Sequence, residues 1–152
     1  MKYLVYLTPS VVMTQYLEAQ RKQRADAIIA VSNNEPHCTL MRIYMDEKNE
    51  SRARHALERI VSPSLELMAK DLAVFHEKDV NTLVLRLEKT PALANLHQKV
   101  IDALRKYICW EETPHILAAH EQDNQRKNAY TNYGSVFYGD FYQPHISIAH
   151  VS

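Results

Sequence analysis

Apolar and polar positions follow each other along the chain in periods that predict strands and helices in turn. Residues 1–7 form a mainly apolar run, and residues 80–87 alternate apolar and polar, which is the period of a half-buried strand. Residues 65–75 are another strand candidate, and the four polar residues between the two predict an antiparallel hairpin. Two further strands are predicted, one at 36–45 and one or two within 133–151.

Helical spacing occupies the segments between these strands. Ser10 is a candidate N-cap for a helix that is predicted to run to about Ile29. Apolar residues within 53–61 recur at helical spacing and predict a second helix. Thr90 and Pro91 combine an N-cap with a proline at the first helical position, which predicts the start of a third helix.

The remaining segment, residues 111–132, is polar with weak periodicity and is predicted to be a loop or an irregular insertion. Strands and helices alternate without the long apolar runs of a parallel sheet, so the fold class is predicted to be α+β with antiparallel sheets. A chain of 152 residues with 46% apolar residues is sufficient for one domain, which we place at 1–152.

The amino-acid composition excludes several classes of binding protein and enzyme. Only two glycines are present, at 134 and 139, which excludes a glycine-rich phosphate loop and a dinucleotide-binding fingerprint. Eighteen basic and eighteen acidic residues give zero formal charge, so duplex DNA is not an expected partner, whereas a nucleotide or a short RNA is compatible with this balance. The two cysteines form no metal or disulfide pattern, and no membrane-spanning run is present; we therefore expect a cytoplasmic protein without metal or cofactor. The oligomeric state is not predicted.

Two segments of the chain share one unusual pattern. Residues 36–40 read Pro-His-Cys-Thr-Leu, and residues 144–148 read Pro-His-Ile-Ser-Ile. Side chains at positions i and i+2 of a strand point to the same face, so each motif projects a histidine with a hydroxyl and turns an apolar face the other way. A histidine two residues before Ser or Thr is expected by chance about once in such a chain, whereas the full pattern occurring twice is far rarer. The four residues that this pattern selects are His37, Thr39, His145 and Ser147.

These residue types suit the opening of a phosphodiester without a metal. One histidine can remove a proton from the attacking oxygen while the other protonates the leaving oxygen, because the imidazole pKa lies near neutrality. Hydroxyl groups can donate hydrogen bonds to the non-bridging phosphate oxygens as charge develops. The sequence does not decide which histidine is the base and which is the acid.

The two motifs, together with the opening strand and the helix after it, make the chain resemble the two-histidine (2H) phosphoesterase superfamily. The resemblance implies a bilobal fold in which two small antiparallel sheets line a central cleft with helices outside. It also implies metal-independent cleavage of a 2',3'-cyclic phosphate or a 2',5'- or 3',5'-linkage, in a cyclic nucleotide, a cyclic oligonucleotide or a short RNA end. By the logic of the family, the four residues selected above are the catalytic set. Two alternatives stay open: a phage or viral anti-defence nuclease that degrades cyclic oligonucleotide signals, and a nucleotide- or RNA-binding module without turnover.

Other polar and aromatic residues give weaker indications. Tyr6 and Tyr142 are the best candidates for stacking a nucleobase, although a role in the strands and the core is the simpler interpretation of the tyrosines. Arg42 is a candidate for neutralising a phosphate, with a rim or structural role as the alternative. His55 and His97 lie on predicted helices among charged residues and are expected at the surface.

Overall fold

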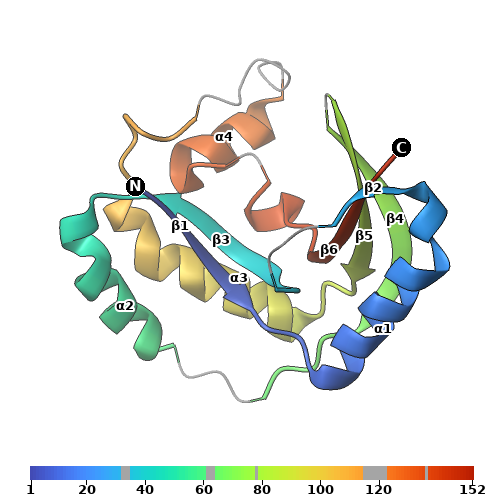
Figure 1. The fold of residues 1–152 in the computed structure, drawn as a ribbon. Helices are drawn as coiled ribbons and strands as arrows, with labels where there is room; N and C mark the ends of the chain where they lie inside the picture. The colour runs from blue at the N-terminus through green and yellow to red at the C-terminus, as the bar shows by residue number, and fades with distance from the viewer. Residues whose placement is uncertain (32–34, 61–63, 78, 115–122, 136) are drawn as a thin grey trace. The chain divides into compact units, whose positions relative to one another are not determined.

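A computed structural model describes residues 1–31, 35–60, 64–77, 79–114, 123–135 and 137–152 (Figure 1). The predicted α+β class is confirmed. The strands are β1 (Lys2–Leu7), β2 (Ile28–Ala30), β3 (Cys38–Tyr44), β4 (Ala69–Glu77), β5 (Val80–Leu87) and β6 (His145–Val151). The α-helices are α1 (Val11–Gln23), α2 (Glu50–Glu58), α3 (Pro91–Leu104) and α4 (Asn124–Tyr133). No helix among the described residues is both long and apolar enough to cross a membrane.

The strands form one antiparallel, six-stranded sheet in the described residues, where two separate small sheets were expected. Hydrogen-bonded neighbours follow the order β1-β3-β6-β5-β4, and β2 pairs with β6 beside this path. The predicted hairpin of β4 and β5 is confirmed, with a register that runs from Glu77 opposite Val80 to Ala69 opposite Leu87. The two expected sheets are continuous because β3 pairs with β6 through Cys38 and Ile146.

The contacts between residues divide the chain into two compact units, each made of three separate segments. The segments of unit 1 are Met1–Val5, Leu40–Leu65 and Lys89–Gln143. The segments of unit 2 are Tyr6–Thr39, Glu66–Glu88 and Pro144–Ser152. Strands β1 and β3 therefore contribute residues to both units. The second histidine motif and residues 36–39 of the first belong to unit 2, whereas Leu40 belongs to unit 1.

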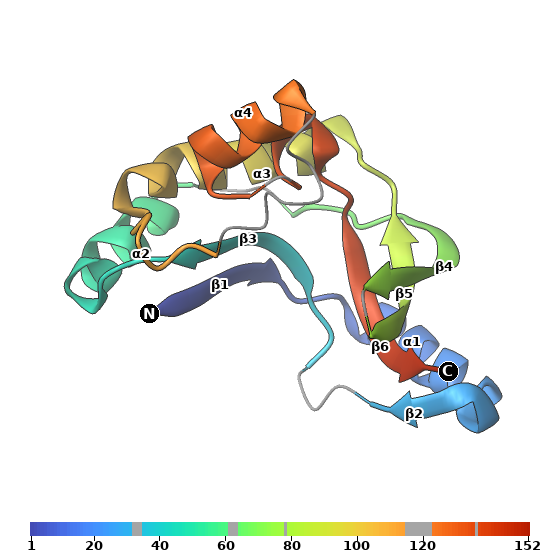
Figure 2. The ribbon, with the colours of Figure 1, turned by 90° about the horizontal axis from the view of Figure 1, so that it is seen from above.

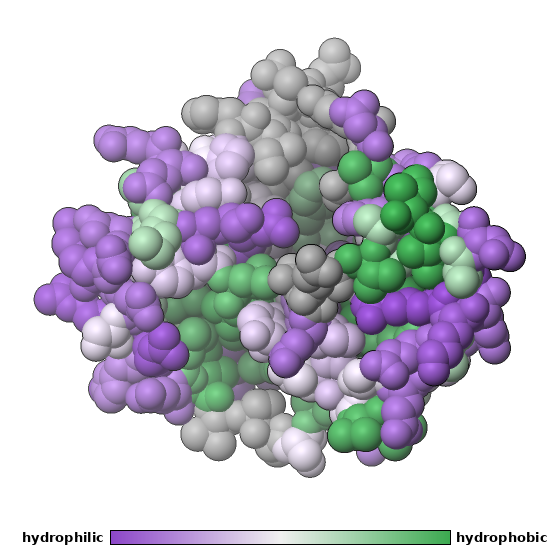
Figure 3. Space-filling view, in the orientation of Figure 1, coloured by the Kyte–Doolittle hydropathy of each residue, from purple (hydrophilic) through white to green (hydrophobic). Residues whose placement is uncertain are grey.

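The core of unit 2 lies between α1 and one face of its strands. Leu17 of α1 is fully buried against apolar side chains of β5 and β6. The other buried members of this cluster are Cys38, Leu83, Leu85, Leu87, Ile146, Ile148 and Ala149. Arg21 fixes the helix further, since its Nε donates to the Ile148 carbonyl at 2.8 Å. In the space-filling view, apolar residues also reach the surface where β2 lies (Figure 3), and there Ile29 is exposed.

Unit 1 is mainly helical. Figures 1 and 2 show α2, α3 and α4 on one face of β1 and β3. The Thr90 side chain accepts a hydrogen bond from the Leu93 N–H and Pro91 opens α3, as the sequence predicts. One face of α3 is buried, with Leu93, Leu96, His97, Val100, Ile101 and Leu104.

Two predicted elements differ from the structure. The first helix ends at Gln23 rather than near Ile29, because a 3₁₀ turn at Ala25–Ala27 leads into strand β2. The loop predicted at 111–132 is a helix in its second half, where α4 begins after the N-cap Asp123 and ends at Gly134, whose φ of 73° suits a residue without a Cβ. Residues 115–122 of that segment lie outside the described residues.

Candidate active site

The first histidine motif enters β3 with the expected alternation of faces. His37 directly precedes the strand, and Cys38 is fully buried on the core side. His37 and Thr39 are both half-buried on the other side. Over residues 37–40 the segment thus alternates half-buried polar side chains with buried apolar ones, whereas further along β3 both Met41 and Ile43 are buried.

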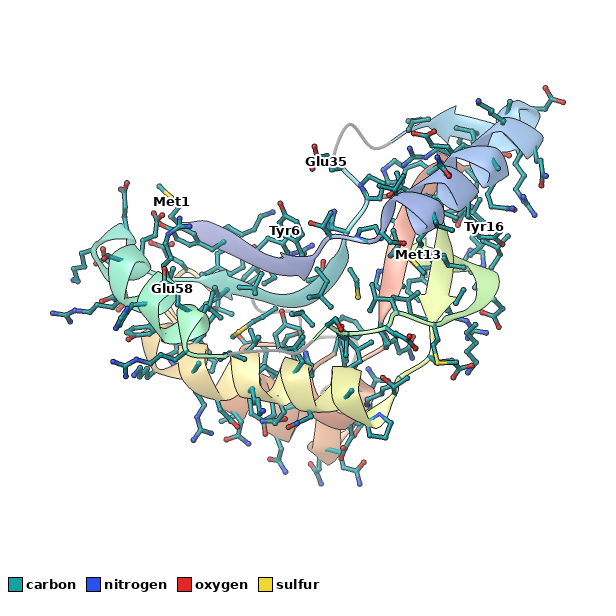
Figure 4. All side chains as sticks on the ribbon, turned by 90° about the horizontal axis from the view of Figure 1, so that it is seen from below. Met1, Tyr6, Met13, Tyr16, Glu35 and Glu58 are labelled. Atoms are coloured by element: carbon teal, nitrogen blue, oxygen red, sulfur yellow. The ribbon has the colours of Figure 1, made fainter. Side chains whose placement is uncertain are left out.

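Two contacts hold the His37 ring. Its Nδ1 lies 2.8 Å from the carbonyl oxygen of Glu35. A carbonyl only accepts hydrogen bonds, so Nδ1 carries the proton, and the neutral ring has its lone pair on Nε2. The ring of Tyr6 lies against the imidazole with 5.1 Å between centroids. Figure 4 labels Tyr6 on β1 and Glu35 ahead of β3.

The second motif opens β6 in the same manner. His145 is the first residue of the strand and Ser147 is half-buried beside it, whereas Ile146 and Ile148 are fully buried in the core of unit 2. The ring of Phe75 on β4 meets the His145 ring edge to face, with centroids 4.8 Å apart. Each of the two histidines is thus in contact with one aromatic ring of unit 2.

The pairing of β3 with β6 brings the two motifs side by side. Cys38 lies opposite Ile146 in an antiparallel register, and both side chains point into the core. The residues on either side of this pair point to the opposite face, and directly opposed side chains have Cβ atoms about 4.5–5.5 Å apart. An antiparallel register continued by one position each way is expected to place the first histidine opposite the serine and the second histidine opposite the threonine. The four residues gathered in this way are His37, Thr39, His145 and Ser147.

A charged pair next to the second motif was not predicted from the sequence. Arg86 on β5 is the register partner of His145, so the two side chains share a face. Asp71 on β4 lies opposite Arg86 and receives two hydrogen bonds from it, one of them from Nε at 2.6 Å. The Arg86 guanidinium holds the pKa of the Asp71 carboxyl below its usual range. The alternation within 80–87 already indicates that Arg86 faces away from the core. Its position beside His145 could not be predicted, because it requires the pairing of β5 with a strand about sixty residues later.

A bulge in β6 adds a third histidine to this face. Leu83 lies opposite Ala149 and Val84 opposite Ser147, so β6 has one extra residue at this point. Ile148 and Ala149 are consequently both buried, and the next residue, His150, lies on the face of His145. His150 Nδ1 lies 3.3 Å from the hydroxyl of Thr82, its register partner.

The remaining predicted binding residues belong to unit 1. Tyr142 is buried, and its ring stacks on His97 with centroids 3.8 Å apart. That ring face is occupied, so the stacking of a nucleobase expected for Tyr142 is not supported. Arg42 has an exposed side chain, and its backbone N–H and carbonyl both bond to the Tyr138 hydroxyl. Neither residue is part of the set gathered in unit 2.

His97 is buried, although the sequence predicts a surface position. Its Nδ1 donates to the Leu40 carbonyl at 2.8 Å, and its Nε2 accepts from the Gly139 N–H at 3.3 Å. Burial lowers the His97 pKa to about 4; the nearby charge of Lys89 acts in the same direction, and the bond to Leu40 opposes both. The ring is therefore neutral near pH 7 and links β3, α3 and the turn at Gly139.

The described residues contain no group of three or more His, Cys, Asp or Glu side chains arranged to hold a metal ion. The polar groups gathered on β3 and β6 are instead imidazoles and hydroxyls, which suit proton transfer and hydrogen bonding.

The comparison with protein families agrees with this geometry. The model of the 2'-5' RNA ligase superfamily matches residues 13–152, which include both motifs and every strand after β1. The chain belongs to the 2'-5' RNA ligase superfamily. This family is part of the 2H phosphoesterase superfamily, as the resemblance of the two motifs implied, and membership supports a phosphoesterase or RNA ligase-like activity. The chain has no significant match among curated proteins or among solved structures.

Proposed function

We propose that this member of the 2'-5' RNA ligase superfamily is a metal-independent phosphodiesterase. Its substrate is a phosphodiester in a cyclic nucleotide, a cyclic oligonucleotide or a short RNA end. The observation that carries the proposal is the pairing of Cys38 with Ile146, which supports a common face for the two histidines and the two hydroxyls of the motifs. This arrangement matches what acid-base cleavage requires: two groups that exchange protons with the two reacting oxygens, and donors for the phosphate between them.

His37 is the general base of the proposed mechanism. The Glu35 carbonyl holds the proton on Nδ1, so Nε2 presents a lone pair to the attacking water or hydroxyl. As the new P–O bond forms, that oxygen loses its proton to Nε2. The ring of Tyr6 limits the orientations of the imidazole, which keeps the lone pair directed.

His145 is the general acid. In its protonated form it gives a proton to the leaving oxygen as the second P–O bond breaks, and it recovers the proton from solvent after release. Thr39 and Ser147 donate hydrogen bonds to the non-bridging oxygens, where negative charge accumulates.

The direct test is alanine substitution of each histidine. His37→Ala and His145→Ala are expected to lower the hydrolysis rate at least ~100-fold, the lower range for general acid-base catalysis. The assay panel contains a 2',3'-cyclic nucleotide, a cyclic dinucleotide and linear dinucleotides with 2',5'- and 3',5'-linkages, with products identified by mass spectrometry. His76→Ala is the matched control, because His76 lies in unit 2 on β4 and is exposed, with its Nδ1 2.8 Å from Asn81 Oδ1. Full activity of either catalytic variant would overturn the proposal.

Two further results separate the proposal from its rivals. Treatment with EDTA is expected to leave the rate unchanged, and a rate that depends on added divalent metal would contradict the mechanism. If nucleotides bind with an affinity that both histidine variants reduce but no product forms, the protein is a binding module instead. Cleavage restricted to cyclic oligonucleotides would assign it to the class that degrades such signals.

A further inference from the structure

The Arg86–Asp71 pair sits beside the proposed acid, on the side away from the proposed base. Across the sheet, β3 carries His37, β6 carries His145, β5 carries Arg86 and β4 carries Asp71, in that order. Arg86 and Asp71 share the face of the catalytic pair, because each is the register partner of a residue on that face. A substrate that extends past His145 over this face therefore meets Arg86 next.

The guanidinium is fixed in place and still has donors to offer. The two bonds to Asp71 use Nε and one Nη2 proton, and a guanidinium has five N–H donors in a planar fork. The Nη1 group is not engaged by Asp71. The side chains of Arg86 and Asp71 are 40% and 42% exposed, so an anionic group from solvent can reach the arginine. An arginine held by a carboxylate in this manner is preorganised for a phosphate.

The spacing of the strands places this arginine beyond the scissile phosphate. The phosphate that reacts lies between His37 and His145, hence between β3 and β6. Neighbouring strands are about 4.8 Å apart, so β5 lies roughly 7 Å from that position. This distance is about the separation of successive phosphates in a nucleotide chain. It is too long for the short side chains of Thr39 and Ser147, which can therefore contact only the scissile phosphate.

We propose that Arg86, held by Asp71, binds a second phosphate that belongs to the leaving nucleoside. The inference rests on the proposed function and narrows its substrate class. A 2',3'-cyclic mononucleotide has no second phosphate, whereas a linear oligonucleotide with a phosphorylated leaving nucleoside and a cyclic oligonucleotide both have one. The enzyme is then specific for a linkage that is followed by another phosphate.

The test compares two linear dinucleotides of the linkage that the enzyme cleaves, identical except for a phosphate on the leaving nucleoside. The wild-type kcat/KM is expected to be at least about tenfold higher for the phosphorylated substrate, mainly through KM, because a charge-assisted hydrogen bond forms only with it. Arg86→Gln is expected to bring this ratio to about one, and Arg86→Lys to an intermediate value, since a lysine keeps the charge but loses the planar fork. Arg52→Gln, an equal charge loss at an exposed position of α2, is the control and is expected to keep the full ratio.

A cyclic dinucleotide tested alongside identifies the source of the second phosphate. If the kcat/KM for the cyclic dinucleotide equals or exceeds that for the phosphorylated linear substrate, and Arg86→Gln lowers it, the result indicates cyclic substrates. A lower kcat/KM for the cyclic dinucleotide indicates linear substrates. Equal wild-type kcat/KM for the two linear substrates would overturn the inference, and so would an Arg86→Gln variant that slows both by the same factor. In either case the proposed function would stand, provided that both substrates are still cleaved and that His145→Ala still lowers the rate at least ~100-fold. If no substrate of the panel is cleaved, the proposed function fails instead.

Discussion

At the scale of single residues, the bond between His37 Nδ1 and the Glu35 carbonyl fixes the tautomer of the first imidazole. It leaves Nε2 as the basic atom of His37, which is why the proposed mechanism gives this residue the role of the base. The sequence alone does not show which histidine is the base. The bond to His37 comes from a backbone carbonyl, which every residue has, so no residue type in the sequence indicates it.

The assignment of acid and base predicts a dependence on the leaving group. A nucleotide p-nitrophenyl ester releases p-nitrophenolate, which needs no proton, so the loss caused by His145→Ala is expected to be at least ~10-fold smaller with this ester than with a dinucleotide. His37→Ala is expected to lose the same factor with both substrates. Stopped-flow or steady-state rates of both variants on both substrates measure this, and the reversed pattern would exchange the two roles.

Residue contacts that join distant parts of the sequence are the ones that sequence reasoning missed. His97 is followed in sequence by Gln98 and Lys99, yet its partner is the carbonyl of Leu40, 57 positions earlier. Arg86 acquires its place beside His145 only through the pairing of β5 with β6. The alternation of buried and half-buried positions within the two motifs could be predicted, because it depends only on neighbouring residues.

At the scale of elements, the two faces of β6 are expected to have different roles. One face is buried in the core, and the other carries residues proposed to act in catalysis. Ile146→Ala is expected to lower the free energy of unfolding by about 2–5 kcal/mol, because it leaves a cavity in the core of unit 2. Ser147→Ala, one position later, is expected to change it by less than about 0.5 kcal/mol while lowering the hydrolysis rate about 100-fold. Urea unfolding and initial rates on the two variants give both quantities. A Ser147 variant that is as active as the wild type would remove its hydroxyl from the proposed mechanism.

Local signals explain which elements could be predicted. The hairpin of β4 and β5 and the start of α3 follow from alternation and from a capping residue with proline. Helix α4 was missed because it is polar and lacks an apolar stripe, although Asp123 and Gly134 mark its two ends. The bulge after Ser147 could not be predicted, since a single extra residue matters only against the partner strand.

At the scale of the whole molecule, buried His97 makes stability depend on pH. Its pKa is about 4 in the folded chain and near 6.5 when exposed, so below pH 6.5 the unfolded chain binds a proton that the folded chain does not. The contribution is complete above pH 6.5 and is lost as the pH falls towards 4, by up to about 3 kcal/mol. Urea unfolding between pH 7.5 and 5 is expected to show this decline, and His97→Gln, which cannot titrate, is expected to flatten it. An equally steep decline in the variant would assign the effect to other groups.

Segments of the two units alternate along the chain, and this limits how the protein can evolve by recombination. Each unit is assembled from three segments, and a break anywhere between Tyr6 and Gln143 divides both of them. A single genetic crossover between two related sequences therefore gives a chain in which both units combine segments from the two parents. Neither unit can be gained or lost as one continuous stretch of sequence. Related proteins with this arrangement are expected to diverge by point substitution and by short replacements within a segment, so that the two histidine motifs descend together.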